Sequence, residues 1–382
     1  MWTCCQLGAR EHYAVPRALH RLGMLDELIT DLWIPRVTGR FHPDLATANV
    51  TAPNIAALTF ELKASFAREN GWNLIVRRNE WFQQCAVDML RHSNDGARNH
   101  TIFAYSYAAE QIFRFARERG WRTVLGQIDP GPADKNLVSR LHETIEDTHW
   151  RPVPQAYWDS WRTECALADQ IVVNSNWSRE TLLEEGVEAE KIRVIPLAYE
   201  AGDQDFERRY PRTFSAVRPL RVLFLGVINL RKGAGELLDA VKLLTDEHVE
   251  FWFVGPTQIH VPEELRHHPQ IKWFGAAPRA AVDRYYREAD VFILPTLSDG
   301  FGLTQLEAQS WKLPVVASRY CGEVVCDGVN GVVLEEVSAR AIADVLRSFL
   351  RSPDTLNAMS KRSGVDDRFS LQALASALRD LV

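Results

Sequence analysis

The second half of the chain alternates short apolar runs with amphipathic segments, and this rhythm constrains the fold more strongly than any other feature of the sequence. The runs are continuously apolar, which is typical of strands buried on both faces of a parallel sheet. Between the first two runs, residues 234–244 carry leucine and valine at helical spacing. Repeated strand–helix–strand units predict a doubly wound α/β domain, with strands at residues 220–226, 249–255, 271–274, 290–295, 314–318 and 332–334.

The first half of the chain repeats this pattern less clearly. Residues 109–119 have the spacing of an amphipathic helix, whereas residues 36–98 fit the α/β rhythm poorly. We therefore expect a mostly helical insertion over 36–98. Strands are expected at residues 101–107, 123–128, 170–174 and 191–197.

The length of 382 residues suits two domains, because one domain holds about 100–200 residues. Residues 199–219 are polar, charged and bounded by proline, so we interpret them as the linker. It would join an N-terminal Rossmann-like domain (1–200) to a C-terminal Rossmann-like domain (220–368). The amphipathic segment 369–382 is expected to be a helix that packs back on the N-terminal domain. Two parallel-sheet domains of this kind face a central cleft, where open α/β sheets bind ligands.

Composition excludes several classes of protein. A net charge of −6 gives no basic field that would attract nucleic acid. The six cysteines form no CxxC pair and no cysteine–histidine spacing, so we expect reduced thiols and no bound metal. The first residues lack the regions of a signal peptide, and no apolar run approaches the ~20 residues of a membrane-spanning helix. We expect a cytoplasmic protein and leave peripheral contact at the inner face of the membrane open.

The first candidate site is the loop from Gly226 to Gly233 (GVINLRKG), between a predicted strand and a predicted helix. A glycine-bearing loop at this position presents unpaired N–H groups, and Arg231 and Lys232 add two positive charges. The combination suits a diphosphate. The loop is neither a P-loop nor a GxGxxG fingerprint, and the simpler alternative is a solvated basic turn.

The second candidate site is the loop that follows the predicted strand 290–295. Asp299 lies in this loop and Glu307 lies eight positions later, where a helix is expected. The glycines between them allow a ligand to approach the backbone closely. Two carboxylates beside an anion site suggest a ligand with hydroxyls as well as phosphates. In the alternative interpretation, Thr304 and Glu307 form a capping box and Asp299 starts an ordinary turn; with the basic loop on the same sheet, we favour the functional interpretation.

These residues resemble a known family. The spacing from Asp299 to Glu307 is similar to the E-x7-E signature of retaining glycosyltransferases with the GT-B fold, and the resemblance is strongest to glycosyltransferase family four, the glycosyl transferases group 1. The loop from Gly8 to Glu11 resembles the GG-x-E loop of that family. The resemblance is specific over about residues 165–335, and further counterparts occur at residues 172–178, 192–197, 289–295 and 327–331.

The resemblance implies an enzyme of bacterial type that transfers a sugar, hexosyltransferase-like, from a UDP- or GDP-linked donor, with retention, without a metal and without a cofactor. The acceptor would be a glycan, a lipid-linked molecule or a small molecule. The implied catalytic residues are Arg231 and Lys232 at the diphosphate, Glu307 at the ribose and Asp299 at the sugar. The implied donor-binding residues are Gly8, Ala9, Arg10, Gly226, Asn229, Gly300, Phe301, Gly302, Leu303 and Thr304.

The chain departs from the family pattern at several positions. The first carboxylate is Asp299 rather than glutamate, Val227 stands where an arginine is usual, and Lys312 stands where glycine is usual. Asp129 lies where the family's N-terminal histidine would be sought, although a turn-forming role fits it better; His142 and His149 are expected to be solvated or capping histidines. Two alternatives to an active glycosyltransferase therefore remain. One is a catalytically inactive GT-B scaffold that binds a nucleotide sugar or a partner. The other is a nicotinamide-dependent oxidoreductase, which the absence of GxGxxG disfavours.

Residues 72–82 (WNLIVRRNEWF) combine aromatic side chains with Arg77 and Arg78. A basic–aromatic helix can rest on an anionic lipid surface. We prefer the alternative, in which the aromatic side chains are buried and the arginines remain in solvent, because one pair of arginines is a weak basic signal.

Overall fold

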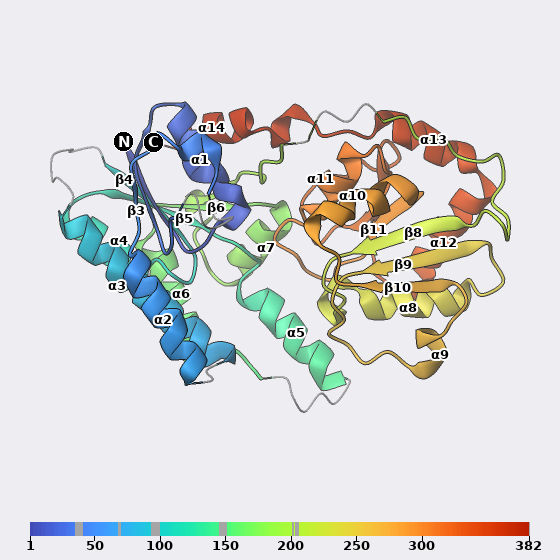
Figure 1. Ribbon diagram of the computed structural model, residues 1–382, viewed down its shortest axis with the longest axis horizontal. Helices are drawn as coiled ribbons and strands as arrows, with labels where there is room; N and C mark the ends of the chain where they lie inside the picture. Colours follow the sequence, from blue (N-terminus) through green and yellow to red (C-terminus); the bar gives the residue numbers. More distant parts are fainter. Residues whose placement is uncertain are drawn as a thin grey trace.

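The computed structural model describes residues 1–34, 41–67, 70–92, 100–144, 151–200, 202 and 206–381, and these residues form two parallel sheets with helices on both faces (Figure 1). One sheet is built from the first 194 residues and the other from residues 220–334. The two lie at opposite ends of the long axis of the molecule. Each sheet is therefore the centre of its own three-layer domain.

The N-terminal sheet has seven strands in the order β3-β2-β1-β4-β5-β6-β7, and every described pair is parallel. The strand order reverses between β1 and β4, so the carboxyl ends of these strands form a switch point. The strands are β1 (Trp2–Gln6), β2 (Leu25–Thr30), β3 (Val50–Thr51), β4 (Thr101–Tyr105), β5 (Arg122–Gly126), β6 (Gln170–Val173) and β7 (Ile192–Val194).

Helices cover both faces of this sheet. One face packs on α3, α4 and α6 through a core that includes Phe82, Phe113 and Trp161, and the other packs on α1. The helices of this domain are α1 (Ala14–Arg21), α2 (Asn54–Phe66), α3 (Gly71–His92), α4 (Glu110–Glu118), α5 (Pro132–Thr144), α6 (Gln155–Leu167) and α7 (Asn176–Glu184).

The C-terminal sheet has six parallel strands in the order β10-β9-β8-β11-β12-β13. Its order reverses between the adjacent strands β8 and β11, where Val222 pairs with Val291. The loops that follow these two strands are the two candidate loops, so the topology brings them together. The strands are β8 (Leu220–Leu225), β9 (Val249–Val254), β10 (Ile271–Gly275), β11 (Val291–Leu294), β12 (Val315–Ser318) and β13 (Gly331–Leu334).

The C-terminal helices pack on this sheet in two layers. The core on one face joins α8, α12 and α13 to the sheet through residues such as Leu237, Leu346 and Leu356, and α10 and α11 contribute to the core on the other face. The helices are α8 (Ala234–Leu243), α9 (Glu263–Arg266), α10 (Arg279–Glu288), α11 (Thr304–Ser310), α12 (Ala339–Arg351), α13 (Pro353–Arg362) and α14 (Leu371–Arg379).

The strands predicted from residue 101 onward are all present within one to three residues of their expected ends. The sequence pattern gave no expectation for β1, β2 and β3. β3 has only two residues, and β2 carries Asp26 and Glu27 among its apolar residues, which hides the buried pattern. The segment 36–98 contains α2 and α3, but it also contains β3, which pairs with β2 at the edge of the sheet.

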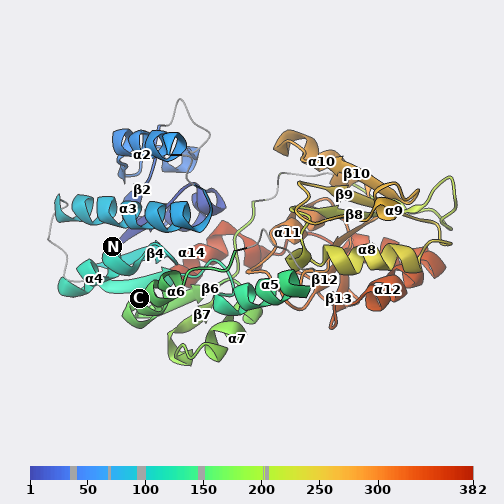
Figure 2. The same ribbon diagram turned by 90° about the horizontal axis from the view of Figure 1, so that it is seen from below.

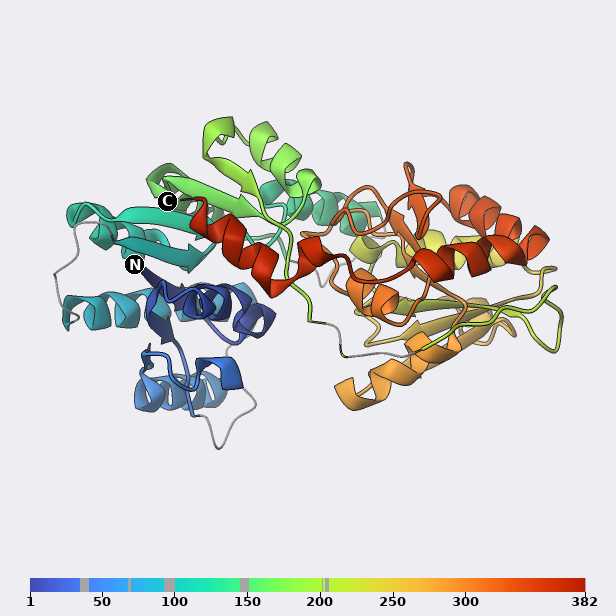
Figure 3. The ribbon, with the colours of Figure 1, turned by 90° about the horizontal axis from the view of Figure 1, so that it is seen from above.

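Two segments connect the domains. Residues 206–219 lie against the C-terminal domain, where the buried guanidinium of Arg208 donates to the carbonyls of Tyr286 (2.7 Å) and Trp311 (3.0 Å). The final helix α14 returns to the N-terminal domain and lies beside α1 (Figure 3). Its buried residues Leu374 and Leu378 belong to a core that contains Trp2.

Candidate functional site

A cavity of about 580 Å³ lies between the two domains, at the carboxyl ends of their strands. Both domains contribute to its walls. The lining residues are Leu7, Arg10, Glu11, Ile128, Asn174 and Leu197 from the first half of the chain, and Lys232, Asp299, Phe301, Gly302, Leu303 and Thr304 from the second. Seven of the predicted site residues are among them: Arg10, Lys232, Asp299, Phe301, Gly302, Leu303 and Thr304.

The basic loop is held in shape by its own backbone. Residues Leu230–Lys232 form a 3₁₀ turn (η4), and the side chain of Asn229 caps it by accepting from the Lys232 N–H at 3.0 Å. Gly233 has φ +73°, and a Cβ there would lie 1.8 Å from the Pro295 carbonyl oxygen. Only glycine fits at this position, and the loop is therefore locked against the end of β11. Asn229 is placed as a cap of the turn rather than as a cavity residue.

Lys232 and Asp299 join the two candidate loops. The Nζ of Lys232 forms an ion pair with Oδ2 of Asp299, and both side chains are mostly buried. Burial alone would raise the pKa of the Asp299 carboxyl, but Lys232 and Arg231 hold its pKa below the ordinary value of 3.8. The carboxyl also lies 3.4 Å from the Phe301 N–H. The turn interpretation of Asp299 is thus only part of its role, because the residue also neutralises a cation in the cavity.

Arg231 is not among the residues that line the cavity. Its Nη1 donates to the Ser298 carbonyl at 2.7 Å and lies 3.6 Å from Oδ1 of Asp134, which belongs to α5 of the N-terminal domain. Only Lys232 of the two predicted phosphate-binding cations therefore lines the cavity in this conformation. Gly8, Ala9, Gly226, Gly300 and Glu307 are also outside the cavity lining, as are Arg231 and Asn229.

The glycine-rich loop packs tightly against the opposite domain. A Cβ on Gly300 would lie 2.6 Å from the Ile128 carbonyl oxygen, and Gly302 has φ +80°. Phe301 is buried against Phe369, so it offers its backbone rather than its ring to the cavity. The loop can therefore contact a ligand through backbone groups close to Lys232.

Glu307 is held by a tyrosine and not by the helix end. Tyr286 on α10 donates from its hydroxyl to Oε2 of Glu307 at 2.7 Å, and Arg279 lies 3.9 Å from Oε1. The N-cap of α11 is Leu303, and no side chain caps that helix end. The capping-box alternative for Thr304 and Glu307 is therefore wrong, and the carboxylate is fixed from outside its helix.

The loop after β1 has an unusual backbone. Gly8 has φ +74° and donates from its N–H to Asp31 at 2.8 Å. Glu11, His12 and Tyr13 follow with φ of +52°, +51° and +59°. Left-handed conformations cost about 1–2 kcal/mol per non-glycine residue and gather at functional sites. They bring Glu11 to the cavity wall, where Tyr105 donates to its Oε2 at 3.1 Å; burial raises the pKa of this carboxyl.

Sequence reasoning did not assign Glu11, Asn174 or Ile128 to the site, although the Gly8–Glu11 resemblance contained the first of them. Asp129 is turned into its own domain, where it accepts from the Tyr107 hydroxyl (2.5 Å) and the Gly131 N–H (2.9 Å). The turn-forming interpretation of Asp129 is thus confirmed. His142 lies on α5, and His149 lies outside the described residues.

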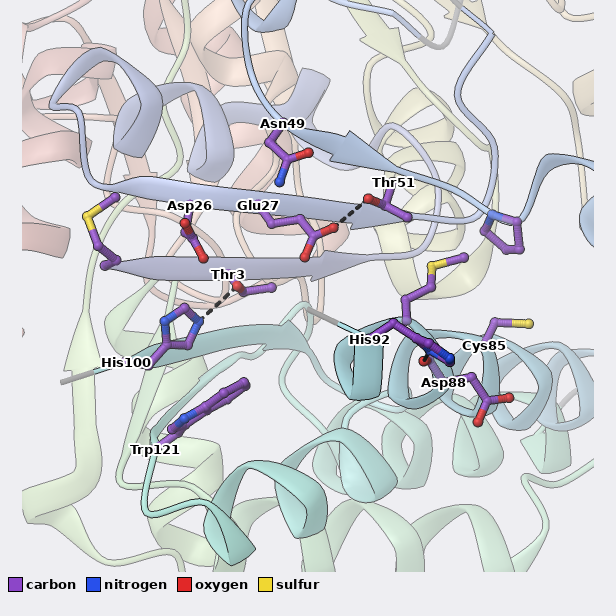
Figure 4. Close-up of a pocket in the computed structure, with 13 residues that line it drawn as sticks. Thr3, Asp26, Glu27, Asn49, Thr51, Cys85, Asp88, His92, His100 and Trp121 are labelled. Carbon is purple, nitrogen blue, oxygen red and sulfur yellow. Dashed lines mark hydrogen bonds between the residues drawn. The ribbon is translucent and has the colours of Figure 1, made fainter. Parts of the chain in front are cut away.

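A larger cavity, of about 960 Å³, lies at the amino ends of the N-terminal strands, between the sheet and α3 (Figure 4). Its charged lining is mainly acidic, with Asp26, Glu27 and Asp88, and no lysine or arginine is among its described lining residues. In Figure 4, Thr51 reaches Glu27 and His100 reaches Thr3. This lining does not suit a diphosphate, so the interdomain cavity is the better candidate. Across the described ranges, no group of three or more potential ligand side chains could hold a metal ion.

Two doubly wound domains facing a shared cleft, with a cation and a carboxylate at the carboxyl edge of the C-terminal sheet, define the GT-B architecture. The chain resembles HepE of Anabaena in complex with UDP (TM-score 0.65, 15% identity, covering 100% of this chain and 98% of that one). It also resembles the catalytic domain of starch synthase IV from Arabidopsis thaliana bound to ADP and acarbose (TM-score 0.69, 13% identity, 100% and 97% covered). These likenesses show the fold.

Residues 207–364 match the family model for glycosyl transferases group 1. The match covers the C-terminal domain, and it shows similarity to that family over these residues. Relatives include the D-inositol 3-phosphate glycosyltransferase of Xylanimonas cellulosilytica, 29% identical over 252 residues that cover 56% of this chain and 58% of the relative. The amylovoran biosynthesis glycosyltransferase AmsK of Erwinia amylovora is 27% identical over 224 residues, 55% of this chain and 52% of the relative. The chain thus matches only somewhat over half the length of these relatives.

Proposed function

We propose that the protein is a glycosyltransferase that binds a nucleoside diphosphate sugar in the cavity between its domains. The observation that carries this proposal is the Lys232–Asp299 pair, which places a cation and a carboxylate side by side in that cavity. The family match of the C-terminal domain and the UDP- and ADP-bound structures of its fold support a nucleotide donor. The donor base and the acceptor are open within this proposal.

The reaction we propose transfers a hexose with retention and without metal or cofactor. The bond between the anomeric carbon and the diphosphate oxygen breaks, and Lys232 and Arg231 stabilise the negative charge that develops on the diphosphate. The acceptor oxygen bonds to the anomeric carbon on the same face, and its proton passes to the departing phosphate oxygen. Asp299 and the backbone of residues 300–302 hold the sugar, Glu307 holds the ribose hydroxyls, and the loop at Gly8, Ala9 and Arg10 closes from the other domain.

The test uses a panel of UDP-, GDP- and ADP-sugars. Binding is measured by thermal shift, and turnover is measured by release of the nucleoside diphosphate. Lys232→Ala and Glu307→Ala are expected to abolish transfer while the circular dichroism spectrum is retained. Near-normal activity in both variants would contradict the proposal. Lys242→Ala is the matched control, because Lys242 is exposed on α8 and pairs only with surface carboxylates.

An inactive scaffold is the alternative that a specific observation favours, because Asp299 already neutralises Lys232 in this conformation. Donor binding without turnover across a broad acceptor panel would support it. Binding of NAD(P) with no binding of a nucleotide sugar would instead support the oxidoreductase.

The acceptor side includes a surface on which the protein can contact a membrane. No helix among the described residues is long and apolar enough to cross a bilayer. The aromatic side chains of α3 pack against other parts of the domain: Phe82 is buried, Trp81 stacks on Phe60 and Trp72 packs on Tyr157. The burial of the aromatic side chains is therefore confirmed, but the arginines are not free in solvent: Arg77 and Arg78 are half-buried and lie over the ring of Phe60.

The neighbouring helix α2, in contrast, exposes large apolar side chains to solvent. It lies at the outer edge of the N-terminal domain, beyond α3 (Figure 2). Its outward face carries four large apolar side chains, Ile55, Leu58, Leu62 and Phe66, that are 51–86% exposed. Such a face can bury itself at the headgroup boundary of a bilayer. We place peripheral membrane contact, as part of the proposal, on α2.

A further inference from the structure

Asp134 is a buried carboxylate that faces the donor loop from the opposite domain. It lies in the first turn of α5, and its side chain is 1% exposed. Helix α5 extends toward the C-terminal domain (Figures 1 and 2) and contacts η4. The only charged groups within ion-pair distance among the described residues are Lys135, 3.3 Å from Oδ2, and Arg231, 3.6 Å from Oδ1.

Its own helix accounts for only part of this carboxylate. The dipole of α5 favours a negative charge in the first turn, but it leaves the hydrogen bonds of a buried carboxylate to be made. Within the described part of the chain, no backbone N–H donates to Asp134, and its Oδ1 is buried without any hydrogen-bond partner. A buried unsatisfied carboxylate oxygen is unfavourable, and the group that approaches it is the guanidinium of Arg231.

The contact with Asp134 holds one corner of the Arg231 guanidinium in place. Arg231 uses Nη1 both for the Ser298 carbonyl at 2.7 Å and for the approach to Asp134. Its Nε and Nη2 have no partner among the described residues. A guanidinium held at one corner loses less freedom when its other N–H groups bind an anion. The next residue in the same loop, Lys232, lines the cavity in which we propose that the diphosphate binds.

We propose that Asp134 is a positioning residue for the donor: it holds Arg231 across the domain boundary so that the free N–H groups of the guanidinium bind the diphosphate. The inference rests on the proposed function. It adds that the N-terminal domain contributes to donor affinity through a group that need not touch the donor. It also means that donor binding depends on the closed arrangement in which α5 contacts η4.

The experiment is a double-mutant cycle read by calorimetric binding of UDP, ADP and GDP, with the tightest of the three used for every variant. Asp134→Ala is expected to weaken binding about tenfold, the effect of losing about 1.4 kcal/mol. In the Arg231→Ala background, Asp134→Ala should have no further effect, because the residue acts only through the arginine. Asp134→Glu should restore affinity to within about threefold of wild type, about 0.7 kcal/mol.

Glu323→Ala is the matched control. Glu323 also bridges the domains, by accepting from the Asn176 N–H at 2.9 Å, but it contacts neither donor loop cation. Its replacement removes that bridge and should leave nucleotide affinity unchanged. Equal losses in Asp134→Ala and Glu323→Ala would show a general effect of loosening the domains and would overturn the proposal. Tighter binding by Asp134→Ala would show that the carboxylate only repels the anion, and additive effects of Asp134→Ala and Arg231→Ala would also overturn it.

Failure of the proposed function gives a different result. If the wild-type protein binds none of the three nucleotides, the proposed function fails. The free energy of unfolding in urea is then measured for the same double-mutant cycle. Coupling between Asp134 and Arg231 in unfolding would show a pair that serves only domain contact, which overturns the positioning role. Absence of coupling would show that Asp134 and Arg231 do not interact, which also overturns the proposal.

Discussion

The hydroxyl of Tyr286 donates a 2.7 Å hydrogen bond to Oε2 of Glu307, and this bond ties the last turn of α10 to the start of α11. Tyr286 is 1% exposed, so its hydroxyl has a fixed position. One carboxylate oxygen of Glu307 is thereby oriented from inside the domain, and the other lies on the side of Arg279. If Glu307 binds ribose hydroxyls, its rotamer is set by a residue 21 positions earlier in the chain.

Tyr286→Phe is expected to weaken nucleotide binding about fivefold to tenfold, because a hydrogen bond to a charged group is worth about 1.5–3 kcal/mol and part of this is recovered by water. KM for the donor should rise more than kcat falls. The check is steady-state kinetics alongside calorimetry. Tyr285→Phe is the control, since among the described residues the hydroxyl of Tyr285 has a hydrogen bond with Arg284 alone. Identical effects of the two variants would rule out a specific role of the bond to Glu307.

Gly300→Ala tests whether close contact between the domains is needed for turnover. The new methyl group would lie 2.6 Å from the Ile128 carbonyl oxygen, which is backbone and cannot move aside alone. The domains must separate, and a misplacement of about 1 Å can lower turnover about 10²-fold. Nucleotide binding should weaken by no more than the roughly tenfold loss expected when the contact between Asp134 and Arg231 is broken, which is less than the expected loss of kcat.

Gly235→Ala provides the comparison for Gly300. A methyl group there meets only Leu230 at 3.7 Å, inside α8. It should leave activity unchanged and raise the unfolding free energy by about 0.5–1 kcal/mol. Loss of turnover in both alanine variants, or in neither, would contradict a role for the Gly300 contact.

Glu164 predicts a pH dependence of stability. It is buried and accepts the N–H groups of Tyr107 (2.7 Å) and Ala109 (2.8 Å), and burial raises its pKa to about 8. The folded state therefore binds more protons than the unfolded state between about pH 4.5 and pH 8, where 4.5 is the ordinary value. The free energy of unfolding should fall as the pH rises through this window.

Urea unfolding at pH 5.5 and pH 8 measures this slope. Glu164→Gln should be less stable than wild type at pH 5.5 by about 1–3 kcal/mol, because it loses an acceptor for a buried N–H. It should also show a flatter decline toward pH 8. Burial also raises the carboxyl pKa values of Glu11 and Asp129. Both residues are present in the wild type and in Glu164→Gln, so the difference between the pH slopes of these two proteins reports Glu164 alone. Parallel slopes would show that Glu164 is ionised throughout the window.

Membrane contact through α2 predicts that the protein sediments with vesicles that contain anionic lipid. Leu58→Glu combined with Leu62→Glu should lower the bound fraction at least about tenfold, because each buried leucine contributes about 1.5–3 kcal/mol. Val217→Glu is the control, since Val217 is 94% exposed on the other domain. Equal sedimentation of the wild type and the double variant would place any membrane contact elsewhere.

Local patterns predicted most of the C-terminal domain. β11 is continuously apolar because both of its faces are covered, and β9 is interrupted only by Glu250, so their sequence alone reveals them. The loops after β8 and β11 were identified by glycine and charge for the same local reason. The N-terminal sheet was harder, because β2 mixes Asp26 and Glu27 with apolar residues and β3 has only two residues.

The amino-acid sequence by itself determined the doubly wound architecture and the two candidate loops, because buried periodicity and loop chemistry are properties of neighbouring residues. The ion pair between Lys232 and Asp299 forms only when the sheet brings these loops together. Tertiary structure alone decided that Glu307 bonds Tyr286 rather than its own helix end, and that Arg231 turns toward Asp134. It also decided that α2 faces outward. These outcomes depend on which surfaces meet when segments up to about a hundred residues apart pack together, and the spacing within any one segment carries no record of that packing.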